Sequence, residues 1–133
     1  MFEKYDLDER LLQALQEKQI TTPTPVQEAA LPHALQGGDV LGQARTGTGK
    51  TLAFAIPIAH RLDEDGTRGR APRALILTPT RELALQVAGE LNWLARHLTV
   101  TAVYGGTGYG SQAAELNRGT DVVVATPGRA LDY

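Results

Sequence analysis

The chain has 133 residues, a formal net charge of −2 and no cysteine. This length suits one domain with a buried core, and a 42% hydrophobic and 21% charged composition is that of an ordinary globular protein. The lack of cysteine excludes disulfides and thiolate metal sites, and the charge excludes a global basic field for nucleic acid. No apolar run is long enough to span a membrane, and the polar N-terminus lacks a signal-peptide pattern. We therefore expect a soluble, cytoplasmic protein.

Two helices are predicted in the N-terminal part of the chain. Residues 7–20 place leucines on one helical stripe, and the segment TTPTPVQ that follows ends that helix. Pro25 suits the first turn of a second helix with its body over 26–35, which Gly37 and Gly38 end.

From residue 39 onward the pattern alternates between strands and helices. The alternation predicts an α/β fold with a parallel sheet flanked by helices and right-handed crossovers. A polar loop over 63–72 and a glycine-rich turn over 105–110 interrupt the pattern. The predicted elements are a strand over 39–44, a helix over 49–62, a strand over 73–78, a helix over 81–97, a strand over 98–104, a helix over 111–118 and a strand over 121–126.

The segment GQARTGTGKT, between the first predicted strand and its helix, has the composition of a phosphate-binding loop. Gly47 and Gly49 allow the backbone to approach an anion closely, where the helix N-terminus favours negative charge. Lys50 would reach the β- and γ-phosphates of a nucleotide, and the Thr51 hydroxyl would bind Mg²⁺. Ala44 departs from the general pattern, which has glycine there. The alternative is a glycine-rich turn with a surface lysine.

The segment 44-ARTGTGKT-51 resembles the phosphate loop of DEAD-box ATP-dependent RNA helicases of the bacterial type. Four further blocks resemble that family in order and spacing, and the likeness covers essentially the whole chain. They are 23-PTPVQ-27 (the Q motif), 79-PTRELALQ-86 (motif Ia), Gly105-Gly106 (the GG element) and 126-TPGR-129 (motif Ib).

The resemblance implies a RecA-like phosphate-loop NTPase fold, incomplete, forming the N-terminal part of the first helicase domain. Residues 1–28 would be the Q-motif region, and residues 29–133 the ATP-binding core up to motif Ib. The implied partner is single-stranded or duplex RNA, and the implied cofactors are ATP and Mg²⁺.

The resemblance assigns Lys50 and Thr51 as catalytic residues and Thr51 as the Mg²⁺ ligand. Gln27 would bind adenine through its N6 and N7 edge, and Phe2 would stack on the ring; the alternatives are a helix cap and a core residue. The family usually has glycine at Gln19 and an aromatic residue at Ile20. The implied ATP-binding residues are Phe2, Ile20, Gln27, Ala44, Arg45, Thr46, Gly47, Thr48, Gly49, Lys50 and Thr51.

The implied RNA-binding residues follow the carboxyl ends of predicted strands, where ligands bind in open α/β sheets. Free N–H groups at a helix start suit RNA phosphates, and Arg81 would add a charge-assisted bond. The alternative is ordinary turns whose arginines pair with Glu82 or Glu90. The implied residues are Pro79, Thr80, Arg81, Gly105, Gly106, Thr126, Pro127, Gly128 and Arg129.

No predicted strand ends in the carboxylate that hydrolysis requires. Asp121 precedes its strand, and Asp132 lies in the predicted start of a helix. We therefore expect the chain alone to be inactive and to need the rest of a helicase core in cis or in trans. A strand over 39–44 without neighbours would have exposed edges, so we expect marginal stability or aggregation. A non-catalytic nucleotide- or RNA-binding module and a small-molecule phosphate-loop kinase remain alternatives.

Overall fold

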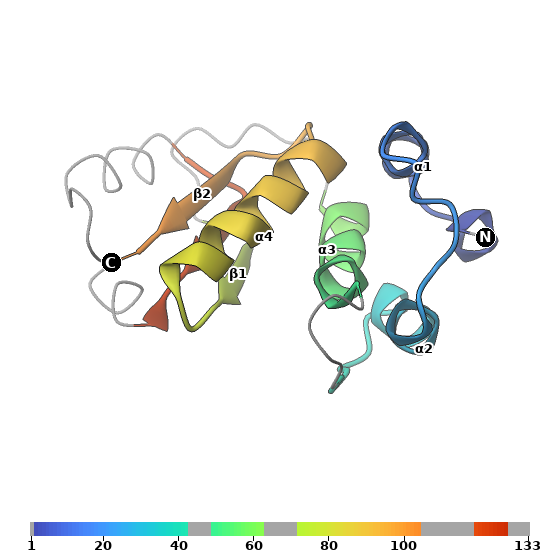
Figure 1. The fold of residues 1–133 in the computed structure, drawn as a ribbon, viewed down its shortest axis with the longest axis horizontal. Helices are drawn as coiled ribbons and strands as arrows, with labels where there is room; N and C mark the ends of the chain where they lie inside the picture. The colour runs from blue at the N-terminus through green and yellow to red at the C-terminus, as the bar shows by residue number, and fades with distance from the viewer. Residues whose placement is uncertain (1, 43–48, 63–71, 105–118, 128–133) are drawn as a thin grey trace. The chain divides into compact units, whose positions relative to one another are not determined.

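A computed structural model describes residues 2–42, 49–62, 72–104 and 119–127 (Figure 1). The chain divides into two compact units, each described by itself. Unit 1 comprises Met1–Asp63 with Trp93–Ala95, and unit 2 comprises Glu64–Asn92 with Arg96–Tyr133. The predicted turn over 105–110 and helix over 111–118 lie outside the described residues. Within the described ranges, no helix has the length and apolar character needed to cross a membrane.

Unit 1 is built from helices, and its three α-helices confirm those predicted from the sequence. A short 3₁₀ helix at the N-terminus was not predicted. Asp8 caps the first α-helix, since its Oδ1 accepts the Arg10 N–H at 2.8 Å. Pro25 begins the second α-helix, as its fixed φ favours. The elements are η1 (Phe2–Tyr5), α1 (Glu9–Glu17), α2 (Pro25–Leu35) and α3 (Lys50–Arg61).

The helices of unit 1 bury their apolar faces. Leu11 and Leu15 of α1, Leu31 of α2 and Ile56 of α3 are fully buried. A hydrogen bond also joins α3 to the residue before α1, because His60 Nδ1 of α3 accepts the Asp8 N–H at 3.1 Å. These contacts join α1, α2 and α3 within unit 1.

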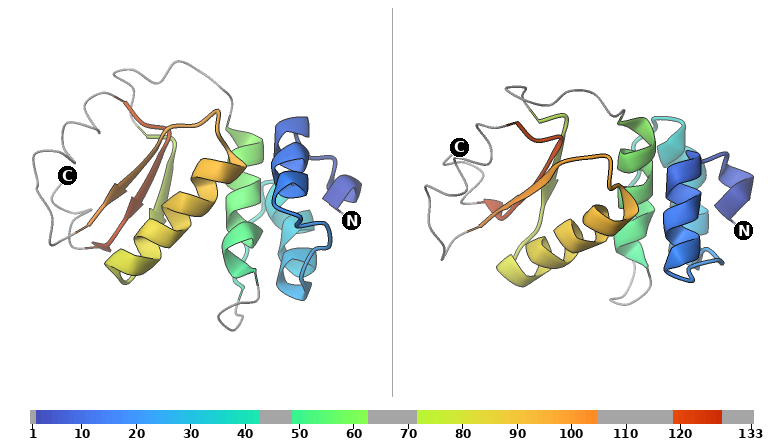
Figure 2. Two further views of the ribbon diagram at one scale, coloured as in Figure 1. Left: turned by 45° about the horizontal axis from the view of Figure 1, so that its top comes forward. Right: turned by 90° about the horizontal axis from the view of Figure 1, so that it is seen from above.

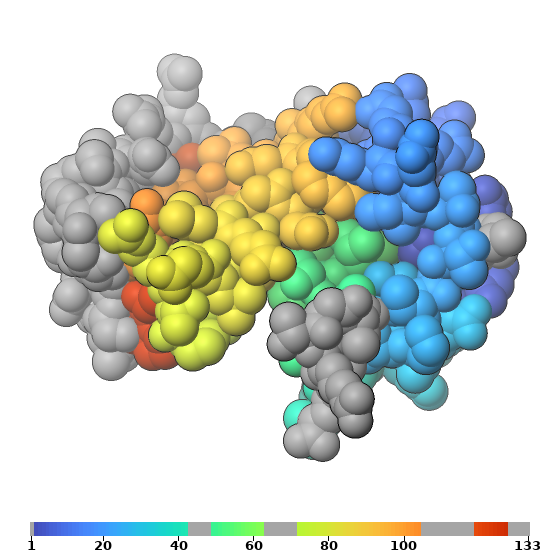
Figure 3. Space-filling view, in the orientation of Figure 1, coloured from blue at the N-terminus to red at the C-terminus, as the bar shows by residue number. Residues whose placement is uncertain are grey.

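Unit 2 contains a parallel three-stranded sheet, which confirms the predicted α/β class. The strand order is β1-β3-β2, with Ile76, Val124 and Ala102 in register. All four residues of β3 are buried, because a central parallel strand is covered on both faces. Figure 2 shows α4 running beside the sheet, and Figure 3 shows its outer face at the surface. The bounds are β1 (Ala74–Leu77), α4 (Arg81–Leu94), β2 (Val100–Val103) and β3 (Val122–Ala125).

The predicted strand over 39–44 is wrong for its described part. Residues 39–42 have no strand structure, and Leu41 is 97% exposed; residues 43 and 44 lie outside the described residues. A strand exists only when its N–H and C=O groups pair with a neighbour, and none of the three described strands pairs with this segment. Its apolar sequence was therefore not sufficient to form a strand.

The edge strand β1 leaves one row of apolar side chains exposed. Leu75 and Leu77 are 59% and 56% exposed, whereas Ile76, which points to the other face, is buried. In register with this row on the central strand, Val123 and Ala125 are buried. The exposed row is therefore confined to the edge, which is where association is expected.

Asp121 ties together the amino ends of the three strands. Its carboxylate, in a residue only 2% exposed, accepts the Thr99 N–H at 2.9 Å and pairs with the Arg73 guanidinium at 2.6 Å. Asp121 precedes β3, Arg73 precedes β1 and Thr99 precedes β2. The carboxylate thus lies at the amino edge of the sheet, as the sequence predicted. Its two partners there give it a structural role.

We predict that Asp121→Ala destabilises the fold by about 3–5 kcal/mol, because it leaves a partly buried guanidinium and an amide without their acceptor. The measurement is the urea midpoint of unfolding. Glu28→Ala is the control, because it removes an exposed ion pair with Lys4 at 3.4 Å that contributes about 0–1 kcal/mol. Equal effects of the two substitutions would contradict this role for Asp121.

Candidate functional site

The side chain of Gln27 connects the starts of two helices. Its Oε1 accepts the Thr24 N–H at 2.9 Å, and its Nε2 donates to the Gly49 carbonyl at 3.0 Å. The first bond caps α2, and the second reaches Gly49, the N-cap residue of α3. Gln27 is only 1% exposed, so both bonds lie in a largely water-free environment, where they are strong.

Gly49 must be glycine for two reasons. Its φ of 81° lies in the left-handed region that residues with a Cβ rarely adopt. A Cβ at this position would also lie 2.5 Å from Gln27 Nε2 and 3.0 Å from the Thr24 methyl. The close approach of Gln27 and the turn into α3 therefore depend on the same missing side chain.

Lys50 and Thr51 form the first turn of α3, directly after Gly49. Lys50 is exposed and Thr51 is half-buried. The N–H groups of a helix's first turn, with the positive end of its dipole, suit an anion. This helix start, which follows a glycine, fits the implied phosphates of ATP. The described residues do not include the rest of the implied loop, which is Ala44, Arg45, Thr46, Gly47 and Thr48.

The remaining residues of the implied adenine site differ in accessibility. Ile20 is half-buried, and the preceding residue, Gln19, has a φ of 59°. The left-handed backbone there gives a physical reason why glycine is usual at that position. Phe2 is buried, with its ring centroid 6.4 Å from that of Tyr5. Its environment favours the alternative in which Phe2 packs in the core.

A second group of candidate residues meets at the carboxyl edge of the sheet in unit 2. The Thr78 N–H donates to the Ala125 carbonyl at 2.9 Å, and the Thr126 N–H donates to the Val103 carbonyl at 3.1 Å. These bonds continue the ladder past the strand ends. They bring the segments after β1, β2 and β3 to one edge. Of the implied RNA-binding residues, Pro79, Thr80, Arg81, Thr126 and Pro127 are described there, and Gly105, Gly106, Gly128 and Arg129 lie outside the described residues.

Thr80 caps α4 at this edge. Its Oγ1 accepts the Leu83 N–H at 3.2 Å, and its carbonyl accepts the Ala84 N–H at 3.0 Å. The N–H groups of Arg81 and Glu82 are left without an acceptor inside the helix. The Arg81 guanidinium carbon lies 5.8 Å from the centroid of the Tyr104 ring.

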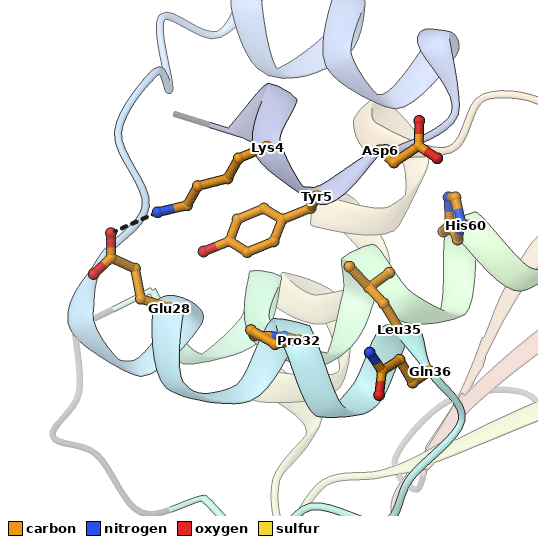
Figure 4. Close-up of a pocket in the computed structure, with 8 residues that line it drawn as sticks. All are labelled: Lys4, Tyr5, Asp6, Glu28, Pro32, Leu35, Gln36 and His60. Carbon is orange, nitrogen blue, oxygen red and sulfur yellow. Dashed lines mark hydrogen bonds and ion pairs between the residues drawn. The ribbon is translucent and has the colours of Figure 1, made fainter.

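A cavity of about 780 Å³ lies elsewhere in unit 1, lined from η1, α2 and α3 (Figure 4). Lys4 Nζ forms an ion pair with Glu28 Oε1 at 3.4 Å and lies 5.3 Å from the Tyr5 ring centroid. None of the implied ATP-binding residues lines this cavity. In the described part of the chain, His, Asp and Glu side chains form no cluster of three suited to a metal ion.

Two residues at these sites were not identified from the sequence. Thr24 supplies the N–H that holds the Gln27 amide, and Tyr104 contacts Arg81. The helix-capping pattern at the start of α2 could have indicated Thr24. An aromatic residue at the end of a predicted strand, next to Gly105, could have indicated Tyr104.

The parallel α/β sheet and the glycine-led helix start are features of the phosphate-loop class of nucleotide-binding proteins. Residues 24–133 match the family model described as DEAD/DEAH box helicase, and the chain belongs to that family.

Curated relatives and solved structures agree with this family. The chain is 50% identical to the ATP-dependent RNA helicase SrmB of Escherichia coli, over 99% of the chain and 30% of that protein. It is 46% identical to the nucleolar RNA helicase 2-A of Xenopus laevis, over 98% of the chain and 18% of that protein. The chain therefore spans less than a third of the length of either relative.

The crystal structure of the RNA helicase Prp28 from Chaetomium thermophilum bound to ADP superposes with a TM-score of 0.89 at 42% identity, over 98% of this chain and 33% of that one. A hypothetical ATP-dependent RNA helicase from Sulfolobus tokodaii gives a TM-score of 0.81 at 41% identity, over 95% of this chain and 36% of that one. These similarities confirm the RecA-like helicase fold.

We predict that Gly49→Ala destabilises unit 1 by about 1–2 kcal/mol through its left-handed backbone, with a further cost from the clash with Gln27. Thermal unfolding measures the change. Gly89→Ala in α4 is the matched control, because a Cβ there meets no atom within 4 Å, and helix propensity should make it stabilising by about 0.5–1 kcal/mol. A neutral Gly49→Ala would contradict the left-handed turn into α3 and the close approach of Gln27 to it.

Proposed function

We propose that this chain is the ATP-binding and RNA-binding part of a DEAD-box RNA helicase that couples ATP hydrolysis to duplex unwinding in the complete protein. The observation that carries the proposal is the hydrogen bond between Gln27 and Gly49, which joins the implied adenine-reading residue to the implied phosphate loop. The relatives named as ATP-dependent RNA helicases support it, as does the ADP-bound state of the Prp28 structure.

The amide of Gln27 retains the capacity to bind adenine. An amide group has two N–H donors and two acceptor lone pairs, and the contacts with Gly49 and Thr24 use one of each. The contacts within the described residues leave one donor and one acceptor of this buried amide, and in the proposal these bind the N7 and N6 atoms of adenine. In the proposal, residues 1–28 are the region that reads the base, with Ile20 packing against it.

In the proposal, residues 29–133 bind the phosphates and the RNA. Backbone N–H groups of the phosphate loop and the Lys50 ammonium would hold the phosphates, and the Thr51 hydroxyl would hold Mg²⁺. When bound, ATP supplies the transferable phosphoryl group, and Mg²⁺ neutralises charge on its oxygens. The carboxyl edge of the sheet, with the first turn of α4, would bind the sugar-phosphate backbone of RNA and so read little base sequence.

Hydrolysis requires a further group in this proposal. Among the described strands, β1 is followed by Thr78, β2 by Tyr104 and β3 by Thr126, so none presents a carboxylate at the carboxyl edge. An acidic residue that orients the attacking water would be supplied by the remainder of a helicase core, in cis or in trans.

We expect the complete protein to act in the cytoplasm.

Lys50→Ala should weaken nucleotide binding about 10- to 100-fold, because a charge-assisted bond to phosphate contributes about 1.5–3 kcal/mol. The measurement is a titration with fluorescently labelled ADP. Lys4→Ala is the control, since among the described residues Lys4 forms an exposed ion pair and a ring contact away from Lys50. Unchanged affinity in Lys50→Ala would contradict the phosphate assignment.

Gln27→Ala should reduce the preference for ATP over GTP to nearly none. A bidentate contact to a base edge discriminates by about 1–3 kcal/mol, and alanine cannot make it. Competition of ATP and GTP against the labelled nucleotide gives the ratio of affinities. Gln36→Ala, at the exposed end of α2, should keep that ratio, and a preserved ratio in Gln27→Ala would remove Gln27 from adenine recognition.

A further inference from the structure

Arg81 and Tyr104 are brought together by the sheet, although they follow different strands. Arg81 begins α4 after β1, and Tyr104 directly follows β2. The guanidinium carbon lies 5.8 Å from the ring centroid, which is within the roughly 6 Å range of cation–π attraction. The two side chains meet at the carboxyl edge, beside Thr80 and Thr126.

The contact with the Tyr104 ring determines where the Arg81 guanidinium lies. Within the part of the chain that the structure describes, the guanidinium forms no ion pair, so the pairing with Glu82 or Glu90 that the sequence left open is not found there. Arg81 is exposed and Tyr104 is half-buried. A half-buried ring is held by its surroundings and can therefore restrict a long, exposed side chain that would otherwise sample many rotamers.

The position of Arg81 is electrostatically suited to an anion. A cation at the first residue of a helix is unfavourable with respect to the helix dipole, and the N–H groups of Arg81 and Glu82, in the same turn, have no acceptor inside the helix. A phosphate placed there would satisfy the guanidinium, the N–H groups and the dipole together. Attraction to a ring uses none of the guanidinium N–H groups as hydrogen-bond donors to oxygen, so these donors stay available for phosphate oxygens.

We propose that Tyr104 is a positioning residue that holds the Arg81 guanidinium at the edge of the sheet, ready to bind an RNA phosphate. This inference rests on the proposed RNA-binding function of the same edge and adds a residue to it. Tyr104 does not need to contact RNA itself. Its contribution is to reduce the side-chain entropy that Arg81 loses on binding.

The test measures binding of the complete protein to a fluorescently labelled oligouridylate at several salt concentrations. Tyr104→Leu should weaken binding about 3- to 10-fold, and Tyr104→Phe should restore it, because the ring face is kept. Arg81→Gln should weaken binding and reduce the salt slope by about one unit. Adding Tyr104→Leu to Arg81→Gln should cause little further loss, since Tyr104 acts through Arg81.

The control is Tyr5→Leu, which removes a ring that contacts Lys4 at 5.3 Å in unit 1, and it should leave RNA binding unchanged. ADP affinity should stay constant in all variants. The positioning role is overturned if Tyr104→Leu weakens RNA binding equally in the unmodified protein and in the Arg81→Gln variant, or if it has no effect. In both cases the unmodified protein still binds RNA, so the proposed function stands. No RNA binding by the unmodified protein would overturn the proposed function and this inference with it.

A second measurement covers the case in which Tyr104→Leu does not fold. Nitrogen relaxation of the Arg81 Nε–H in the unmodified protein reports whether the side chain is ordered before RNA is added. An Arg81 Nε–H that is ordered in the unmodified protein before RNA is added supports the proposal. A freely mobile Arg81 side chain in the unmodified protein overturns it.

Discussion

The hydrogen bond from the buried Gln27 amide to the Gly49 carbonyl is the interaction on which the nucleotide site depends. It fixes the turn into α3 against the start of α2, and Gly49 permits it because a Cβ would occupy the space of the amide. The residue proposed to read adenine and the turn proposed to hold phosphates are therefore in direct contact. Binding of phosphate at the turn should therefore affect the environment of the Gln27 amide, and binding of adenine should affect the turn, since a shared hydrogen bond couples the two groups.

The second site depends on the parallel sheet. Because parallel strands end at the same edge, the ladder bonds of Thr78 and Thr126 collect three segments that are distant in sequence. The two edges of this sheet have different roles. At the amino edge Asp121 is engaged with Arg73 and Thr99. In the described part of the chain, the carboxyl edge presents helix N–H groups, hydroxyls and the Arg81 guanidinium, which form a surface suited to anions.

Local patterns were sufficient to predict most of this fold. The helical stripes, Pro25 and the apolar run of β3 gave the correct elements, because they depend on capping, φ restriction and burial that neighbouring residues determine. The strand predicted over 39–44 was wrong for residues 39–42, since a strand needs a partner that local sequence does not contain. The contact of Tyr104 with Arg81 depends on strand order, and the burial of Phe2 on tertiary packing, so neither followed from spacing. The glycine expected at Gln19 reflects a backbone φ of 59° that only the structure reveals.

The most direct test of the central claim is a nuclear magnetic resonance titration that follows the side-chain amide of Gln27 and the backbone amides of Gly49 and Lys50. If the adenine-reading and phosphate-binding residues form one coupled site, ADP should shift all three sets of signals, with the Gln27 amide protected from exchange. Inorganic pyrophosphate should shift Gly49 and Lys50 strongly and Gln27 weakly. Shifts at Gly49 and Lys50 with no response of Gln27 to ADP would contradict the account.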